Sequence, residues 1–331
     1  MKIKKLFFLA FILAFTYVNA QNKIDPVLHF NTNNEFKILQ ITDIHYVYGR
    51  TTSDSAIQRM SYLLDIEQPD FVVFTGDIIT SKKQQECWDI VLKPVIDRKI
   101  PWAVVLGNHD DEHNWSRREI ISYLEKQPYS LTQMGPEELK GAGNYTIPLL
   151  TRAGKKSHIL YFMDSNAYST IAGINGYGWF GFDQIAWYRN MSEDFTKENG
   201  GNPYPALAFF HIPLNEFEML FDTTKNYKVY GTRGEKECPG ALNSGMFTAM
   251  QEKGDVMGVF VGHEHDNDYI GVLRGIALAY SRFSGCNNIY NHIGYGARVI
   301  ILKENERTFD TWIRTSEGEV LYKVNYPADF K

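Results

Sequence analysis

Residues 36–46 read FKILQITDIHY, an apolar stretch that ends in an aspartate and a histidine two positions apart. Four more apolar runs follow the same plan: FVVFT at 71–75, WAVVL at 102–106, ALAFF at 206–210 and VMGVFV at 256–261. Short continuous runs rich in β-branched and aromatic residues are typical of strands buried on both faces. We therefore predict five buried strands.

Segments with helical spacing separate the early runs. One apolar face comprises Ala56, Met60, Leu63, Leu64 and Ile66, and a second comprises Trp88, Val91, Leu92, Val95 and Ile96. Alternating strands and helices predict parallel strands joined by crossovers, hence an α/β fold with helices outside. Beyond residue 265, segments 270–280, 298–303, 307–314 and 320–325 follow one another with short turns. They suggest a second, largely antiparallel sheet packed on the first.

Each of the five runs is followed by residues that can bind a ligand. These are Asp43 and His45, Gly76 and Asp77, Gly107 to Asp110, His211, and Gly262 to His265. In open α/β sheets, ligands bind at the carboxyl ends of the strands, so we expect these side chains to converge. The glycines are expected to let the backbone turn sharply.

This donor set predicts a metal site. It holds aspartates, an amide oxygen and histidines but no cysteine, which excludes thiolate zinc sites and suits Mn, Fe, Zn or Co. One ion needs only three or four groups, so two ions about 3.5–4 Å apart, bridged by a carboxylate, use the set best. Singly, Asp43 could cap a helix and His211 could be a core histidine. The ordered series of five makes those explanations weak.

The same series resembles the calcineurin-like metallophosphoesterases over roughly residues 36–300. Three segments are similar to the purple-acid-phosphatase-like branch, which has fungal, plant and bacterial secreted members. They are QITDIHY at 40–46, ALAFFHIPLNEF at 206–217 and LNSGMFTAMQEKGDVMGVFVGHEHDND at 242–268. The resemblance implies a four-layer α/β/β/α sandwich of two mixed β-sheets flanked by helices. True purple acid phosphatases carry a tyrosine ligand where this chain has Thr80, so His45 would take a ligand position instead.

Position by position, the resemblance implies two divalent or trivalent ions (Mn, Fe or Zn). Asp43, His45, Asp77 and His265 would hold one, and Asp77, Asn108, His211 and His263 the other, so that Asp77 bridges. His109 matches the family histidine that stabilises developing charge or protonates the leaving oxygen, a role that suits imidazole. Asp110 is expected either to orient His109 or to be a solvated turn residue. Glu264 is expected to point away from the metals.

The implied activity is hydrolysis of phosphate esters by a metal-bridging hydroxide, with monoesters favoured over nucleotide or phospholipid-type diesters. The alternative, from another class of function, is a noncatalytic exported binding protein on the same scaffold. Arg50, Arg233, Arg282 and His292 lie in loops expected near the metal edge and are candidates for binding the rest of a small phosphorylated substrate. The sequence leaves the oligomeric state open.

Residues 1–20 resemble a secretory signal peptide. They carry Lys2, Lys4 and Lys5 and no acid, followed by an apolar stretch at 6–18, with cleavage expected between Ala20 and Gln21. That stretch is shorter than the ~20 residues a membrane span needs. We expect residues 21–331 to form a single domain that is secreted or periplasmic, without stable membrane insertion.

Charge and cysteine content add two expectations. The whole chain has a formal net charge of −5. The mature chain would be more acidic, which disfavours binding to a nucleic acid scaffold. In an oxidising compartment, Cys238 and Cys286, both in glycine-rich loops, are the expected disulfide pair, which would leave Cys87 as a buried thiol.

Overall fold

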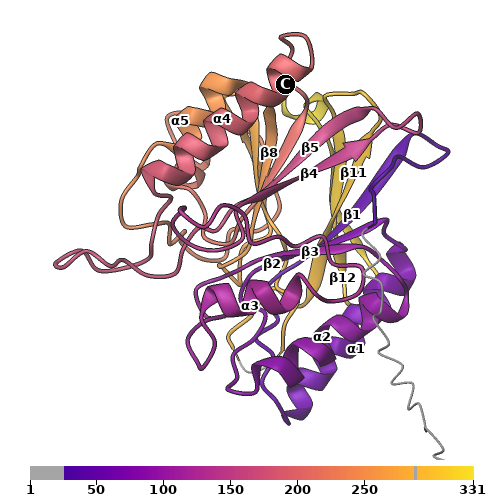
Figure 1. The fold of residues 1–331 in the computed structure, drawn as a ribbon, viewed down its shortest axis with the longest axis vertical. Helices are drawn as coiled ribbons and strands as arrows, with labels where there is room; N and C mark the ends of the chain where they lie inside the picture. The colour runs from indigo at the N-terminus through magenta and orange to yellow at the C-terminus, as the bar shows by residue number, and fades with distance from the viewer. Residues whose placement is uncertain (1–25, 287–288) are drawn as a thin grey trace, which may run out of the picture.

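The computed structural model describes residues 26–286 and 289–331 and contains two β-sheets packed face to face (Figure 1). The first sheet has the order β13-β12-β11-β1-β2-β3, and the second has the order β4-β5-β6-β8-β10-β9-β7. The first comprises β1 (Glu35–Ile41), β2 (Phe71–Thr75), β3 (Trp102–Val105), β11 (Gly296–Lys303), β12 (Phe309–Thr315) and β13 (Val320–Tyr326). The second comprises β4 (Tyr145–Leu150), β5 (Lys156–Phe162), β6 (Ala206–Phe209), β7 (Val229–Tyr230), β8 (Val256–Val261), β9 (Ile270–Leu273) and β10 (Ile276–Tyr280).

Helices cover the outer faces of both sheets. Figure 1 shows α1–α3 on one side of the sandwich and α4 and α5 on the other. Their bounds are α1 (Thr51–Glu67), α2 (Gln84–Asp97), α3 (Arg117–Leu124), α4 (Phe182–Glu198) and α5 (Met246–Lys253), with short 3₁₀ turns at η1 (Asn215–Phe221) and η2 (Ala328–Phe330). The predicted four-layer α/β/β/α sandwich of two mixed sheets is confirmed.

The side chains of β1 point alternately to the two faces of the sheet, so this strand packs against the layer on either side. Phe36 and Ile38 face the core between the sheets, whereas Leu39 and Ile41 pack with Met60 and the other apolar residues of α1 and α2. Burying one such side chain stabilises the fold by about 1.5–3 kcal/mol. Because both faces are largely buried, the strand lacks regular alternation of polar and apolar residues, and after Glu35 only Lys37 and Gln40 interrupt its apolar residues.

The carboxyl ends of the five predicted strands meet at one edge of the sandwich, although the strands belong to both sheets. Strands β1, β2 and β3 are parallel in the first sheet, and β6 and β8 are parallel in the second. Two hydrogen bonds join the ends: the Gln40 Nε2 donates to the Val261 carbonyl at 3.0 Å, and the Gly262 N–H donates to the His211 carbonyl at 3.2 Å.

The expected division into a parallel sheet and a later antiparallel sheet is wrong. Strand β11 pairs antiparallel with β1, so β11, β12 and β13 extend the first sheet instead of forming a second one. Segment 270–280 is two strands, because Arg274 and Gly275 adopt positive φ and turn the chain between β9 and β10. Each sheet therefore contains both parallel and antiparallel pairs.

The expected disulfide is not formed either. All three cysteines are free; Cys238 is exposed, whereas Cys286 is buried with its Sγ 3.8 Å from both the Ser53 Oγ and the His45 carbonyl oxygen. Among the described residues, none of the helices has both the length and the apolar character that crossing a bilayer requires. The predicted signal peptide lies outside the described residues.

Candidate metal centre

Two triads of buried side chains lie side by side at the shared strand edge. Asp43, His45 and His265 form one, and Asp77, His211 and His263 form the other; each triad could hold a metal ion. The Nε2 atoms of His45 and His265 are 3.2 Å apart, and the His263 Nδ1 is 3.3 Å from the His211 Nε2. The structure therefore brings together residues up to 222 positions apart, from both sheets.

Asp77 belongs to the second triad and also faces the first. Its Oδ2 is 3.1 Å from the His211 Nε2, 3.9 Å from the His45 Nε2 and 4.0 Å from the His109 Nε2. Its Oδ1 accepts the backbone N–H of His109 at 2.8 Å. One oxygen is thus fixed by the backbone while the other faces both triads, which suits a bridging ligand.

Hydrogen bonds at the far side of the rings select which imidazole nitrogen faces inward. The His211 Nδ1 donates to the Thr75 carbonyl at 2.7 Å, and the His265 Nδ1 donates to the Tyr290 carbonyl at 3.2 Å. Because a carbonyl only accepts, each ring carries its hydrogen on Nδ1 and presents Nε2 to the centre. Such outer hydrogen bonds orient the histidines of metal sites.

Four of the expected ligands have an unusual backbone. Asp43, His45, Asp77 and His263 adopt φ values of 54°, 49°, 53° and 84°. Non-glycine residues in this left-handed region cost about 1–3 kcal/mol each and cluster at functional sites. The conformation aims each side chain from its strand end into the shared centre.

The glycines beside the ligands act mainly by being small. Of Gly76, Gly107 and Gly262, only Gly76 has a positive φ, at 88°. A Cβ on Gly107 would overlap the Asp77 carboxylate, and one on Gly262 would overlap the Thr42 hydroxyl. The expected turning role therefore holds for Gly76, whereas Gly107 and Gly262 allow the close packing of ligand loops.

The site balances its buried charges internally. Burial alone would raise the pKa values of Asp43 and Asp77, but the facing histidines outweigh it and hold both below their usual range. Burial would lower the pKa of His211, yet the Asp77 and Asp43 carboxylates raise it to about 10. Burial and the neighbouring His211 lower the pKa of His263 to about 3. A proton on His211 thus offsets part of the carboxylate charge that a metal cation would neutralise.

The residues present fit a metal centre. The Oδ1 atoms of Asp43 and Asn108 are buried oxygens without a hydrogen-bond donor in the described part of the chain. Buried acceptors are normally satisfied, so two orphan oxygens beside imidazole nitrogens match the needs of cations.

Asp110 does not orient His109, contrary to that expectation. Its carboxylate accepts four backbone N–H groups, from Asp77, Ile78, Ile79 and Gly107, at 2.8–3.0 Å. It is fully buried and therefore is not a solvated turn residue either. Asp110 joins the loop after β2 to the loop after β3, which fixes Asp77 relative to Asn108.

Glu112, which the sequence reasoning missed, takes the place expected for Asp110. Its Oε2 lies 2.8 Å from the His109 Nδ1. Glu264 points away from the centre as expected, because its Oε1 accepts the Cys238 N–H at 2.6 Å.

Three of the four expected substrate-binding residues are turned toward carboxylates. Arg233 makes two hydrogen bonds to Glu237, at 2.9 and 2.5 Å. The Arg282 Nε lies 3.2 Å from Asp268, and the His292 Nδ1 lies 2.5 Å from Asp266. These pairs argue against a direct substrate contact. Arg50 lies at the N-cap of α1.

Aromatic rings flank the two triads. Tyr177 packs edge-on against His263 with ring centroids 4.3 Å apart, and Tyr290 stacks on His265 at 4.6 Å. Tyr177 precedes α4 and Tyr290 precedes β11, so both rings come from connecting segments outside the sheets. Arg117, also missed, supports the loop after β3: it donates to the Gly107 carbonyl at 2.7 Å and pairs with Asp164.

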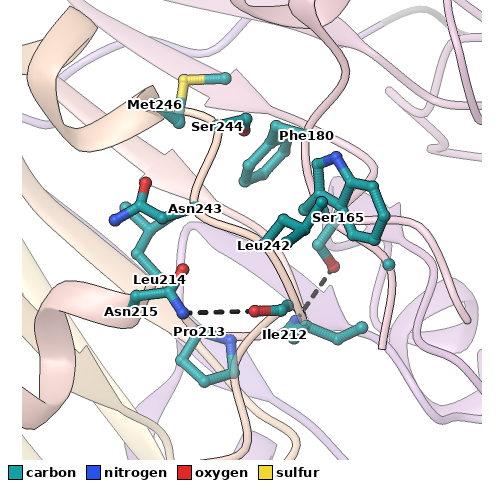
Figure 2. Close-up of a pocket in the computed structure, with 13 residues that line it drawn as sticks. Ser165, Phe180, Ile212, Pro213, Leu214, Asn215, Leu242, Asn243, Ser244 and Met246 are labelled. Carbon is teal, nitrogen blue, oxygen red and sulfur yellow. Dashed lines mark hydrogen bonds between the residues drawn. The ribbon is translucent and has the colours of Figure 1, made fainter. Parts of the chain in front are cut away.

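Figure 2 shows a separate crevice, lined in part by Ile212, the residue that follows His211 in the chain. Its lining includes Ser165, Phe180, Ile212, Leu242 and Met246. The Ser165 hydroxyl already accepts the Ile212 N–H at 3.0 Å. The crevice contains none of the residues of the two triads.

Known proteins resemble this chain in sequence. The family described as calcineurin-like phosphoesterase matches residues 36–267. An Arabidopsis thaliana protein named probable inactive purple acid phosphatase 29 is 35% identical over 319 residues, which cover 86% of this chain and 81% of that protein. Phosphatase DCR2 of Saccharomyces cerevisiae is 31% identical over 314 residues, covering 85% of this chain and 54% of that protein.

A solved structure resembles it in fold. A dimetal phosphatase from Danio rerio superimposes with a TM-score of 0.58 at 14% identity, covering 88% of this chain and 98% of that one. At this identity the likeness concerns the arrangement of sheets and helices.

Proposed function

This chain belongs to the calcineurin-like phosphoesterase family, and on that premise we propose that it is a phosphohydrolase that cleaves phosphate monoesters with two metal ions. The observation that carries the proposal is the position of Asp77, whose Oδ2 faces donors of both triads. Two ions sharing one carboxylate form the arrangement that clamps a phosphate ester during in-line displacement.

The chain's own residues have distinct tasks in this reaction. Asp43, His45 and His265 would hold one ion, with Asp77 shared, and Asn108, His211 and His263 would hold the other. Bound there, the ions supply charge neutralisation and an activated water. His109 reaches over Asp77 with its Nε2 and is partly exposed, so it can hold a proton for the leaving oxygen of an entering substrate.

Two other functions compete with monoester hydrolysis. Diester hydrolysis uses the same centre, so the substrate assay below decides between the two. A noncatalytic binding role gains support from the word "inactive" in the name of the Arabidopsis relative. Against it, this chain carries every expected ligand and also His109, which a binding scaffold does not need.

Export and metal identity belong to the proposal as well. The lysine-led apolar segment at residues 1–20 supports secretion or delivery to a periplasm. The nitrogen and oxygen donor set supports Mn, Fe or Zn.

The decisive experiment is an assay of the full-length chain, produced with its own amino-terminal segment and loaded with Mn, Fe or Zn. The substrates are p-nitrophenyl phosphate, bis-p-nitrophenyl phosphate, nucleotides and phospholipid head groups. We expect metal-dependent release of phosphate from monoesters, abolished by Asp77→Asn but not by Asp97→Asn, which removes an exposed carboxylate on α2. Faster cleavage of the diester would favour phosphodiesterase activity, and inactivity with every metal would favour a binding role. Amino-terminal sequencing of the exported chain should begin at Gln21.

A further inference from the structure

The structure holds a hydrogen-bonded chain that begins at His109 and returns to the metal centre. The Glu112 Oε2 lies 2.8 Å from the His109 Nδ1, and the Glu112 Oε1 accepts the Tyr168 hydroxyl at 2.9 Å. The Tyr168 oxygen in turn accepts the Asn108 Nδ2 at 3.3 Å. Four side chains from two separate segments are thus joined.

This chain determines which atoms face the centre. Because the Asn108 amide nitrogen points to Tyr168, its oxygen is the atom left to face the metals, and that Oδ1 is buried without a donor among the described residues. Because the His109 Nδ1 points to Glu112, its Nε2 is the nitrogen that faces the Asp77 Oδ2, at 4.0 Å.

An exposed pair of this kind would ordinarily contribute little, since surface ion pairs are worth about 0–1 kcal/mol. Here both carboxylate oxygens are engaged, and Tyr168 is itself held in place. Its ring stacks on Tyr177 with centroids 5.7 Å apart, the two residues form a β-bridge, and Tyr177 packs on His263. Residues 166–178 therefore connect the second triad to Glu112: Tyr177 packs on His263, and Tyr168, held by Tyr177, donates to Glu112.

We propose, on the basis of the hydrolase function above, that Glu112 and Tyr168 are positioning residues for His109 and that the natural substrates are alkyl phosphate esters. An alkoxide is a poor leaving group and needs a proton as the P–O bond breaks. The His109 imidazolium donates its Nε2 proton to the leaving oxygen and becomes the neutral ring with its hydrogen on Nδ1. Glu112 accepts that Nδ1 hydrogen in a hydrogen bond throughout, which keeps the ring in the donating orientation. The p-nitrophenolate ion leaves without a proton, so aryl esters gain little from the same arrangement.

The kinetic test compares glycerol 2-phosphate with p-nitrophenyl phosphate in the metal-loaded enzyme. Glu112→Gln should lower kcat for the alkyl ester by about 10- to 100-fold and for the aryl ester by less than about threefold, with metal content unchanged. Tyr168→Phe should act in the same direction but less. The control is Glu86→Gln, which removes an exposed carboxylate that pairs with Lys83. Equal losses on both substrates, or no loss on either, would overturn the proposal.

A second readout does not depend on activity. Nitrogen-15 NMR of histidine-labelled protein, with His109 assigned from the His109→Ala spectrum and recorded at a pH where the ring is neutral, should show one tautomer with the hydrogen on Nδ1, the form left after proton donation. Glu112→Gln should populate both tautomers. A tautomer mixture already present in the unsubstituted protein would disprove the positioning role even if the chain hydrolyses p-nitrophenyl phosphate. Inactivity on every substrate combined with the single tautomer would refute the hydrolase function and, with it, the alkyl ester assignment.

Discussion

Two buried histidines near opposite ends of neighbouring parallel strands are held in opposite ways. His158 lies near the start of β5, and His211 lies just beyond the end of β6, at the other end of the sandwich. Both are fully buried. Yet burial lowers the pKa of His158 to about 4, whereas at His211 the carboxylates of Asp77 and Asp43 overcome burial and raise the pKa to about 10.

The difference lies in what each ring contacts. The His158 Nε2 donates to the Glu306 carbonyl at 2.9 Å, and its Nδ1 accepts the Ser157 hydroxyl at 2.9 Å, so a neutral ring is fully satisfied. The His211 ring uses only Nδ1 for the backbone and presents Nε2 to charged groups. A buried histidine is therefore a ligand candidate when one nitrogen is left facing carboxylates, and burial alone does not distinguish the two cases.

Removing His211 should produce the largest effect on turnover. His211→Ala should leave about one ion per chain by elemental analysis and reduce phosphatase activity at least about 10⁴-fold, because a metal contributes both charge stabilisation and the activated water. His158→Gln is the matched control and should retain both ions and full activity. If the two variants behaved alike, the distinction drawn between the two ends of the sandwich would be wrong.

Replacing His109 should affect chemistry without affecting the metals. Loss of a positioned proton donor typically costs about 10²- to 10⁴-fold, so His109→Ala should lower kcat by that amount while two ions stay bound. Steady-state kinetics with parallel metal analysis measures both. Unchanged turnover with metal bound would remove His109 from the mechanism.

The strands that carry the ligands could be predicted because their residues are buried on both sides. FVVFT and VMGVFV need no tertiary information to be recognised as strands. Strand β5 was missed because Lys156, Ser157 and His158 make its start polar, and β4 was missed because Pro148 interrupts an edge strand. Assignment of strands to sheets failed because the pairing of Ile38 with Ile300 joins distant segments that carry no local signal.

The side chains that meet in the two triads could also be predicted to converge, since each follows a recognisable strand. Glu112 and Tyr168 could not, because neither has a strand-end context and their contact joins loops 56 residues apart. Asp110 was misjudged for a related reason: a sequence shows that a carboxylate follows His109 but not that it turns inward to four backbone N–H groups.

A smaller effect is expected from crowding the ligand loops. A methyl group at Gly262 would overlap the Thr42 hydroxyl, which donates to the Asp43 Oδ2 at 2.7 Å. Displacing a group that orients a ligand typically weakens metal affinity about 10- to 100-fold, which a metal titration of Gly262→Ala would detect.

Gly258, in strand β8, which ends just before Gly262, supplies the control for this substitution. A Cβ there would lie 3.0 Å from the Phe260 ring, away from the ligands. Gly258→Ala should therefore cost some stability and leave metal affinity within about threefold. Equal affinity losses in both variants would mean that the strand as a whole had moved.

Replacing His158 should have the smallest effect on turnover, with no change at neutral pH. It should instead change how the stability of the fold depends on acid pH. The folded pKa of His158, about 4, lies below the ordinary value of 6.5, so the unfolded chain takes up the proton more readily. Stability from this group is therefore complete above pH 6.5, falls as the pH drops toward 4, and then stays constant, with a total loss of about 3 kcal/mol. His158→Gln removes this titration, and urea unfolding between pH 7.5 and 4 should show a shallower loss of stability than the unsubstituted protein. Parallel curves would show that the buried ring does not remain neutral, and the contrast with His211 would then rest on geometry alone.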